Sequence, residues 1–378
     1  MSTQPALDPN FLSSPTDMVQ LLTPEGERVE NADFRFDGDD AQIAGYLRDM
    51  VLARRLDIEA TALQRQGELG LWPPLLGQEA AQIGAGRAVR ATDMVFPTYR
   101  EHAVAMTQGV DIGDILGLYR GTHLGHWDSI GKHFHNYTVV IGAQTLHATG
   151  YAMGMQRDGM VGNPDPDRNG AVLAFHGDGA SSQGDVNEAY VFAASYNAPV
   201  VFFCQNNQWA ISEPITRQTR IPLYQRALGF GFPGVRVDGN DVLAVKAVTD
   251  WALERARTGQ GPAFIEAFTY RMGAHTTSDD PSKYRLAAET EHWKLKDPIE
   301  RVRAYLMRHA SLPASFFTDL DAEAEEFGAS VRTTCRGLAN PELSQIFDAV
   351  YAEQTPLLAE QKDEYLTYAS TFEPGVVA

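Results

Sequence analysis

The feature that most constrains the fold is a pair of short, almost wholly apolar runs in the middle of the chain. The runs are AVLAFH at residues 171–176 and PVVFFC at residues 199–204, and between them DVNEAYVFAASYN at residues 185–197 is interpreted as a helix. An apolar run of this length is typical of a strand buried on both faces. A strand, a helix and a second strand joined by short loops predict a right-handed parallel crossover.

The same alternation of elements returns later in the chain. GVRVDG at residues 234–239 and AFIEAFTYR at residues 263–271 have the composition of strands, and a helix is predicted over residues 241–258 between them. Repeated strand–helix–strand units belong to the α/β class. We therefore predict a doubly wound, mostly parallel sheet flanked by helices.

The remaining parts of the chain suggest three regions. Residues 1–40 contain several prolines and little helical periodicity, so they are predicted to form an extended arm. Apolar residues then recur at helical spacing from Ile43 onward. We expect the α/β domain to cover residues 41–300 and a helical C-terminal extension, packed on the same domain, to cover residues 301–378.

Charge and composition exclude several classes of partner. The 378 residues include 49 acidic and 31 basic side chains, and the formal charge of −18 disfavours nucleic acid and anionic membranes as partners. Two cysteines cannot form a disulfide framework. No Lys or Arg precedes Arg28 and no apolar run approaches the roughly 18 residues that span a bilayer. A cytoplasmic protein is expected.

Polar residues follow both of the central strands. Asp178 comes after the first strand and Asn207 after the second, and parallel strands place such positions at the same edge of the sheet. Carboxylate and amide oxygens suit magnesium, which fills its shell with phosphate oxygens and water. Gly177 and Gly179 allow the backbone to approach a ligand closely. The pattern predicts a magnesium–diphosphate site.

Two other phosphate-binding motifs fit this segment poorly. The dinucleotide fingerprint G-x-G-x-x-G fails because Ser182 occupies the position of its last glycine. The Gly-Lys-Ser/Thr of a P-loop occurs nowhere in the chain.

The segment GDGASSQGDVNEAYVFAASYNAPVVFFCQNNQWAIS resembles the thiamine diphosphate motif of the 2-oxo acid dehydrogenases. The chain is most similar to the alpha subunit of their first, decarboxylating component. The similarity runs from about residue 40 to the C-terminus, and it includes GQEAAQIG (77–84), FPTYREH (96–102), RVDGNDVLAV (236–245) and YRMGAHTTSDDPSKYR (270–285).

The resemblance implies a set of ligands for magnesium and thiamine diphosphate. Magnesium would be held by the side chains of Asp178 and Asn207 and by the backbone carbonyl of Trp209. The positions that the resemblance assigns to cofactor binding are Tyr99, Arg100, Val139, Ile141, Gly177, Gly179, Ala180, Gln205 and His275. Gln205 stands where the family often has arginine, so one phosphate-binding charge is missing.

Catalytic and substrate positions follow from the same resemblance. His275 and Arg271 belong to the loop that faces the diphosphate and the reaction centre, and both are assigned catalytic roles. Leu71 and Trp72 either line the substrate pocket or belong to the core. Because the loop from Arg271 to Arg285 is polar and small, we expect it to pack weakly and to become ordered when the cofactor binds.

The implied activity is thiamine diphosphate-dependent oxidative decarboxylation of a 2-oxo acid, with transfer of the acyl group to the lipoyl group of a transacylase component. The activating glutamate would come from a beta subunit in an alpha2–beta2 heterotetramer. HTTSDD and VDGNDV favour a branched-chain substrate such as 3-methyl-2-oxobutanoate, whereas IGAQ favours pyruvate, and acetoin dehydrogenase also stays open. Two readings from other classes remain: a non-catalytic assembly subunit and a nicotinamide-dependent oxidoreductase.

Overall fold

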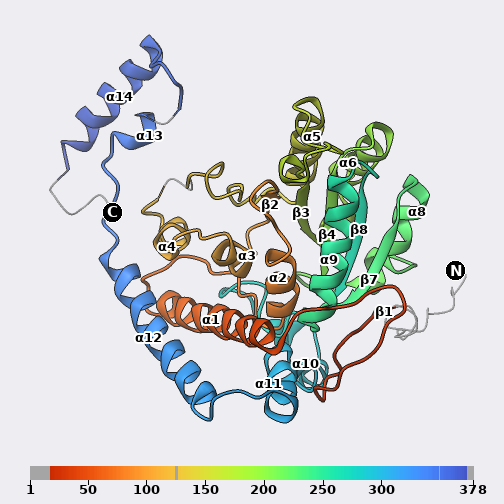
Figure 1. Ribbon diagram of the computed structural model, residues 1–378. Coiled ribbons are helices and arrows are strands. Elements are labelled where there is room, and N and C mark those ends of the chain that lie inside the picture. The colour runs from red at the N-terminus through yellow and green to blue at the C-terminus, as the bar shows by residue number, and fades with distance from the viewer. Residues whose placement is uncertain (1–17, 124–126, 349, 373–378) are drawn as a thin grey trace, which may run out of the picture.

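The computed structural model describes residues 18–123, 127–348 and 350–372 (Figure 1). Its centre is a sheet of six parallel strands in the order β1-β7-β8-β4-β3-β2. The strands are β1 (Met18–Val19), β2 (Met94–Phe96), β3 (Val172–Gly177), β4 (Val200–Asn206), β7 (Gly234–Asp238) and β8 (Ala263–Phe268). The predicted α/β class with a parallel sheet is confirmed.

All four strands that the sequence indicated are present, as β3, β4, β7 and β8. The two outer strands, β1 and β2, were not predicted, because two or three residues are too few to show a pattern. A separate antiparallel pair, β5 (Trp209–Ala210) and β6 (Glu213–Pro214), follows β4.

Helices cover both faces of the sheet because neighbouring strand residues point to opposite sides. In β4, Val200 and Phe202 pack in the cluster that includes α5 (Ala143–Arg157) and α6 (Gly184–Tyr196). Val201 and Phe203 belong to the cluster on the other face. The apolar runs at residues 171–176 and 199–204, which form most of β3 and β4, are buried on both faces of the sheet. This burial explains why their composition is almost continuously apolar.

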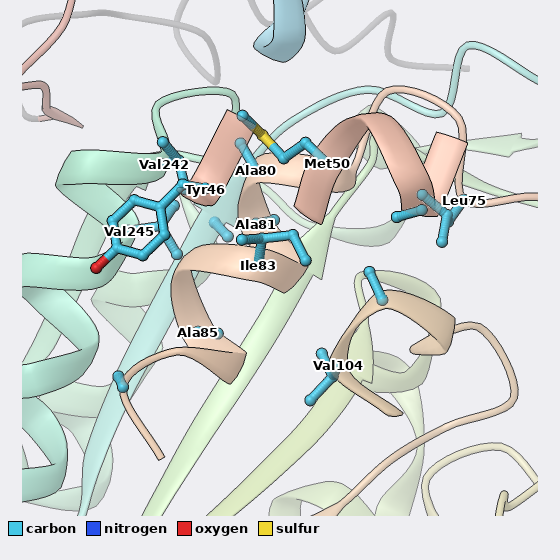
Figure 2. Packing of buried hydrophobic residues seen from close by; sticks show 14 of the residues in the cluster. Tyr46, Met50, Leu75, Ala80, Ala81, Ile83, Ala85, Val104, Val242 and Val245 are labelled. Carbon is cyan, nitrogen blue, oxygen red and sulfur yellow. The ribbon is translucent and has the colours of Figure 1, made fainter. Parts of the chain in front are cut away.

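The second face is covered by α2 (Glu79–Gly86) and α9 (Val242–Arg257), with α1 (Asp40–Arg65) and α3 (His102–Thr107) packed around α2 (Figure 2). A Cβ on Gly84 would lie 2.8 Å from the Cβ of Val245. Glycine therefore permits the close approach of α2 and α9 that Figure 2 shows.

The described part of the predicted N-terminal arm lies along the sheet edge. β1 pairs with β7, and the backbone N–H groups of Leu21 and Leu22 both donate to the Asp241 carboxylate at 2.6 Å. Residues 1–17 of the predicted arm lie outside the described residues.

The C-terminal part is helical. The remaining helices are α4 (Ile112–Arg120), α7 (Ile215–Gln218), α8 (Arg226–Phe230), α10 (Ala287–Lys294), α11 (Pro298–His309), α12 (Phe316–Gly337), α13 (Gln345–Asp348) and α14 (Pro356–Ala369). α11 and α12 pack against α1, whereas α13 and α14 pack on each other and lie apart from the sheet in Figure 1.

The three-region division of the chain stays a prediction. Across the described ranges, none of the helices combines the length and apolarity needed to cross a membrane.

Candidate active site

A cavity of about 270 Å³ lies at the carboxyl ends of β3 and β4. Twelve of the fifteen predicted site residues line it: Tyr99, Arg100, Ile141, Gly177, Asp178, Gly179, Ala180, Gln205, Asn207, Trp209, Arg271 and His275. They come from segments that are up to 176 positions apart in sequence (275 − 99), and the fold brings them together around one space.

Oxygen donors gather where the two strands end. Asp178 is 2% exposed, and its carboxylate accepts a hydrogen bond from Gln218 Nε2 at 2.9 Å. Burial raises the pKa of Asp178 to about 6. Asn207 is also buried, and its Nδ2 donates to Gln78 Oε1 at 3.1 Å, which fixes the direction of the amide. The Trp209 carbonyl accepts from Arg271 Nη1 at 2.8 Å and keeps a second lone pair.

Two glycines shape the floor of the cavity. A Cβ on Gly179 would lie 2.7 Å from the Ala210 Cβ, so no larger residue fits without a shift. A Cβ on Gly177 would meet nothing within 4 Å, although the residue lines the cavity. The turn after β3 thus approaches β5 closely and leaves its backbone accessible to a ligand.

Two guanidinium groups converge on His275. Arg100 Nη2 lies 3.2 Å and Arg271 Nη1 lies 3.4 Å from the Nδ1 atom of His275. A guanidinium has no acceptor, so Nδ1 accepts and the neutral ring carries its proton on Nε2. Burial, together with the charges of Arg100 and Arg271, lowers the pKa of His275 to about 3. The cluster is strongly cationic and suits an anion.

A buried carboxylate, that of Glu101, also lines the cavity. Glu101 Oε1 accepts from Gln205 Nε2 at 2.5 Å, and Glu101 Oε2 accepts from the backbone N–H and the hydroxyl of Thr98 at 2.5 and 2.6 Å. Burial raises the pKa of Glu101. Among the described residues, the side-chain oxygens of Gln205 and Gln144 are buried without a partner. Gln205 therefore offers an acceptor to a ligand where an arginine would offer a charge.

The three other predicted residues lie outside the cavity lining. Val139 and Leu71 are exposed at 72% and 51%. Trp72 is fully buried, and its Nε1 donates to Asp57 at 2.8 Å. For Trp72, the structure favours the core interpretation that the sequence left open.

Sequence reasoning missed eight lining residues: Gln78, Thr98, Glu101, Thr138, Gly142, Gln144, Ala210 and Ile211. Each lies within a few positions of a residue or motif already singled out, such as GQEA, TYRE, VVIGAQ or NNQWAIS. The available signal was therefore proximity in sequence to those motifs.

The loop after β8 is held by polar contacts. The Arg285 guanidinium donates to the carbonyls of Arg271, Met272 and Gly273 at 2.5, 3.0 and 2.8 Å. Asp279 accepts from the His275 backbone N–H at 2.8 Å and from the Tyr284 hydroxyl at 2.5 Å. The expectation of weak packing considered apolar contacts and overlooked this hydrogen bonding. Ordering on cofactor binding stays a prediction.

Comparison with known proteins gives consistent matches. The family model described as "Dehydrogenase E1 component" matches residues 47–326. A 3-methyl-2-oxobutanoate dehydrogenase subunit alpha of Mycobacterium tuberculosis is 42% identical over 355 residues, which cover 94% of this chain and 95% of the relative. Pyruvate dehydrogenase E1 component subunits alpha are 36% identical in Staphylococcus epidermidis, over 94% of each chain, and 39% identical in Acholeplasma laidlawii, over 84% of this chain and 91% of the relative.

Proposed function

Because the chain belongs to the dehydrogenase E1 component family, we propose that it is the alpha subunit of a branched-chain 2-oxo acid dehydrogenase. Its relatives are alpha subunits of 2-oxo acid dehydrogenases, which are oxidoreductases, and the family uses thiamine diphosphate. The substrate would be a branched-chain 2-oxo acid such as 3-methyl-2-oxobutanoate. The observation that carries this choice is 42% identity to a 3-methyl-2-oxobutanoate dehydrogenase alpha subunit along almost the whole of both chains.

The cavity residues fit magnesium and a diphosphate. Asp178, Asn207 and the Trp209 carbonyl supply three hard oxygen donors at one end of the cavity. Arg100 and Arg271 line the same cavity and supply two permanent positive charges, which suit an anionic diphosphate. The turn at Gly179 and Ala180 would contact the diphosphate through its backbone, and Tyr99 would contribute beside Arg100.

When bound, thiamine diphosphate supplies the nucleophilic and electron-accepting chemistry that a 2-oxo acid needs to lose carbon dioxide. Ile141 would support the cofactor from the cavity wall. His275 is neutral and carries its proton on Nε2, so it would donate a hydrogen bond to an anionic group while Arg100 and Arg271 hold its ring in place. Arg271 would also orient the Trp209 carbonyl for magnesium.

A beta subunit would complete the site. Val139 and Val140 are exposed at 72% and 71%, and they directly precede Ile141, which lines the cavity. Exposed apolar residues at the rim of a cavity are typical of a surface that another chain covers. We expect an alpha2–beta2 heterotetramer, with the beta subunit supplying the activating glutamate and a lipoyl-bearing transacylase accepting the acyl group.

A turnover panel tests the substrate assignment. The chain co-expressed with its beta subunit should decarboxylate 3-methyl-2-oxobutanoate with a higher kcat/KM than pyruvate. Pyruvate is the second candidate because the two pyruvate dehydrogenase alpha subunits are 36% and 39% identical. A preference for pyruvate or acetoin would reassign the substrate, and no turnover of any of the three despite cofactor binding would favour a non-catalytic subunit.

The dependence on a beta subunit has its own test. The purified chain alone should show no decarboxylation, and activity should appear on adding the beta subunit. Equal rates with and without the beta subunit would contradict the two-subunit assignment.

A further inference from the structure

Asp57 of α1 is a buried carboxylate that lies outside the cavity lining. Its Oδ1 accepts from Trp72 Nε1 at 2.8 Å, and its Oδ2 accepts from the backbone N–H groups of Leu75 and Leu76 at 2.7 and 2.9 Å. Burial raises the pKa of Asp57 to about 7. A buried carboxylate destabilises a fold unless its hydrogen bonds compensate, so these three bonds hold the segment Trp72–Leu76 firmly on α1.

That segment is bonded to one side of the cationic cluster through Arg100. The Pro74 carbonyl accepts from Arg100 Nη1 at 2.7 Å, while Nη2 of the same guanidinium faces His275. The neighbouring Pro73 carbonyl lies 3.1 Å from His102 Nε2, and the ring of His102 stacks on Trp72 with centroids 4.2 Å apart. The position of the segment therefore sets the direction of the Arg100 side chain.

The same segment is bonded to the loop that carries His275. The Trp72 backbone N–H donates to Thr277 Oγ1 at 3.1 Å, and the Thr277 N–H donates to the Trp72 carbonyl at 2.9 Å. The Met272 N–H donates to the Leu76 carbonyl at 3.0 Å. These bonds lie on both sides of His275 in sequence.

We propose that Asp57 is a positioning residue for the cavity: by fixing Trp72–Leu76, it holds Arg100 and the His275 loop in one arrangement. This inference rests on the proposed function, in that thiamine diphosphate occupies the cavity. Asp57 contacts neither the Arg100 side chain nor the His275 loop. Its effect therefore passes through the Pro74 carbonyl and through the hydrogen bonds to Thr277 and Met272.

Asp57→Asn in the alpha–beta complex is the main test. An amide has one acceptor oxygen, so its NH2 group must face either Trp72 Nε1–H or the two backbone N–H groups, donor against donor. We expect the Kd for thiamine diphosphate with magnesium to rise about 10-fold or more, in line with a distorted charged contact. Tryptic cleavage after the exposed Lys283 of the cofactor-loaded complex should accelerate several-fold.

Asp241→Asn is a matched control. Asp241 is also a buried carboxylate outside the cavity lining, and it accepts the backbone N–H groups of Leu21, Leu22, Leu243 and Ala244. The Asp241→Asn variant should have a lower free energy of unfolding, while its cofactor Kd should stay within about two-fold of wild type. Trp72→Phe is a milder variant, because it keeps an aromatic ring against His102 while it removes the bond to Asp57 Oδ1 and leaves a small cavity in place of part of the indole. It should raise the Kd by about 2–5-fold.

The outcomes separate this inference from the function it rests on. Wild-type complex that does not bind thiamine diphosphate would overturn the proposed function. Wild-type complex that binds it, while Asp57→Asn binds equally well, would overturn the role of Asp57. If Asp57→Asn does not fold, Trp72→Phe decides: unchanged cofactor Kd and unchanged cleavage after Lys283 would also overturn it.

Discussion

Two walls of the cavity are built in different ways. The strand-end wall comprises residues 177–180 and 205–209, which follow two neighbouring parallel strands, and Gly177 and Gln205 are paired in the β-ladder. The loop wall is formed by Gln78, residues 98–101, Arg271 and His275. The segments that carry these residues, 72–78, 98–101 and 271–277, are distant in sequence and are joined by side-chain and backbone hydrogen bonds. The sheet positions the first wall, and a hydrogen-bond network positions the second.

The two walls should therefore respond to different kinds of substitution. The oxygen donors Asp178 and Asn207 keep their places as long as β3 and β4 stay paired, so changes there should act through the donor atoms themselves. In our proposal, the arrangement of Arg100 and His275 depends on residues outside the cavity lining, such as Asp57 and Arg285. The loop wall should therefore be sensitive to substitutions at a distance.

The largest effect is expected on the strand-end wall, from Asp178→Asn. The amide has the same shape but lacks the charge that magnesium and the diphosphate require, so the Kd for magnesium-dependent cofactor binding should rise about 100-fold or more. Because burial raises the pKa of Asp178 to about 6, its charge at pH 8 disfavours the cofactor-free fold, and the neutral amide should not lower the free energy of unfolding. Calorimetry and chemical denaturation measure the two quantities. A large loss of stability would mean that Asp178 holds the fold and not the ligand.

A smaller effect is expected on the loop wall, from Arg285→Ala. Three carbonyls lose a charged donor, which should lower the free energy of unfolding by about 2–4 kcal/mol. Cofactor affinity should fall about 10-fold, because the loop that carries Arg271 and His275 loosens. Chemical denaturation and cofactor titration give these values.

Arg257→Ala is the control for Arg285→Ala. Arg257 is 1% exposed and donates from Nε to Asp93 at 2.9 Å, outside the cavity lining. Arg257→Ala should lower the free energy of unfolding by an amount similar to that for Arg285→Ala, without changing the cofactor Kd. Equal effects of both variants on cofactor affinity would show that general stability, and not loop position, controls binding.

The smallest effect is expected at Thr276, whose hydroxyl lies 3.2 Å from that of Ser278 at the exposed side of the loop. Thr276→Glu places a negative charge next to His275, where it competes with the diphosphate for Arg100 and Arg271, and activity should fall about 5–10-fold. Thr276→Ser should stay close to wild type. Initial rates at several cofactor concentrations test this prediction. Full activity of Thr276→Glu at a low cofactor concentration would contradict the placement of this loop beside the diphosphate.

Sequence reasoning reached the strand-end wall because local patterns determine it. Two buried runs, a helix and the positions of Asp178 and Asn207 suffice to place those side chains at one sheet edge. Tyr99, Arg100, Arg271 and His275 were reached only through resemblance to a family. The links of Asp57, Pro74 and Thr277 have no periodic pattern, since hydrogen bonds between distant loops leave no signal in one sequence.

We propose that this cavity binds thiamine diphosphate through magnesium held at Asp178 and Asn207. Calorimetric titration of the alpha–beta complex with thiamine diphosphate, in magnesium and in a chelator, tests it most directly. We predict saturable binding with one cofactor per alpha subunit in magnesium, about 100-fold weaker binding in the chelator, and no magnesium dependence in Asp178→Ala. Wild-type affinity in Asp178→Ala, or no binding by the wild-type complex, would contradict the account.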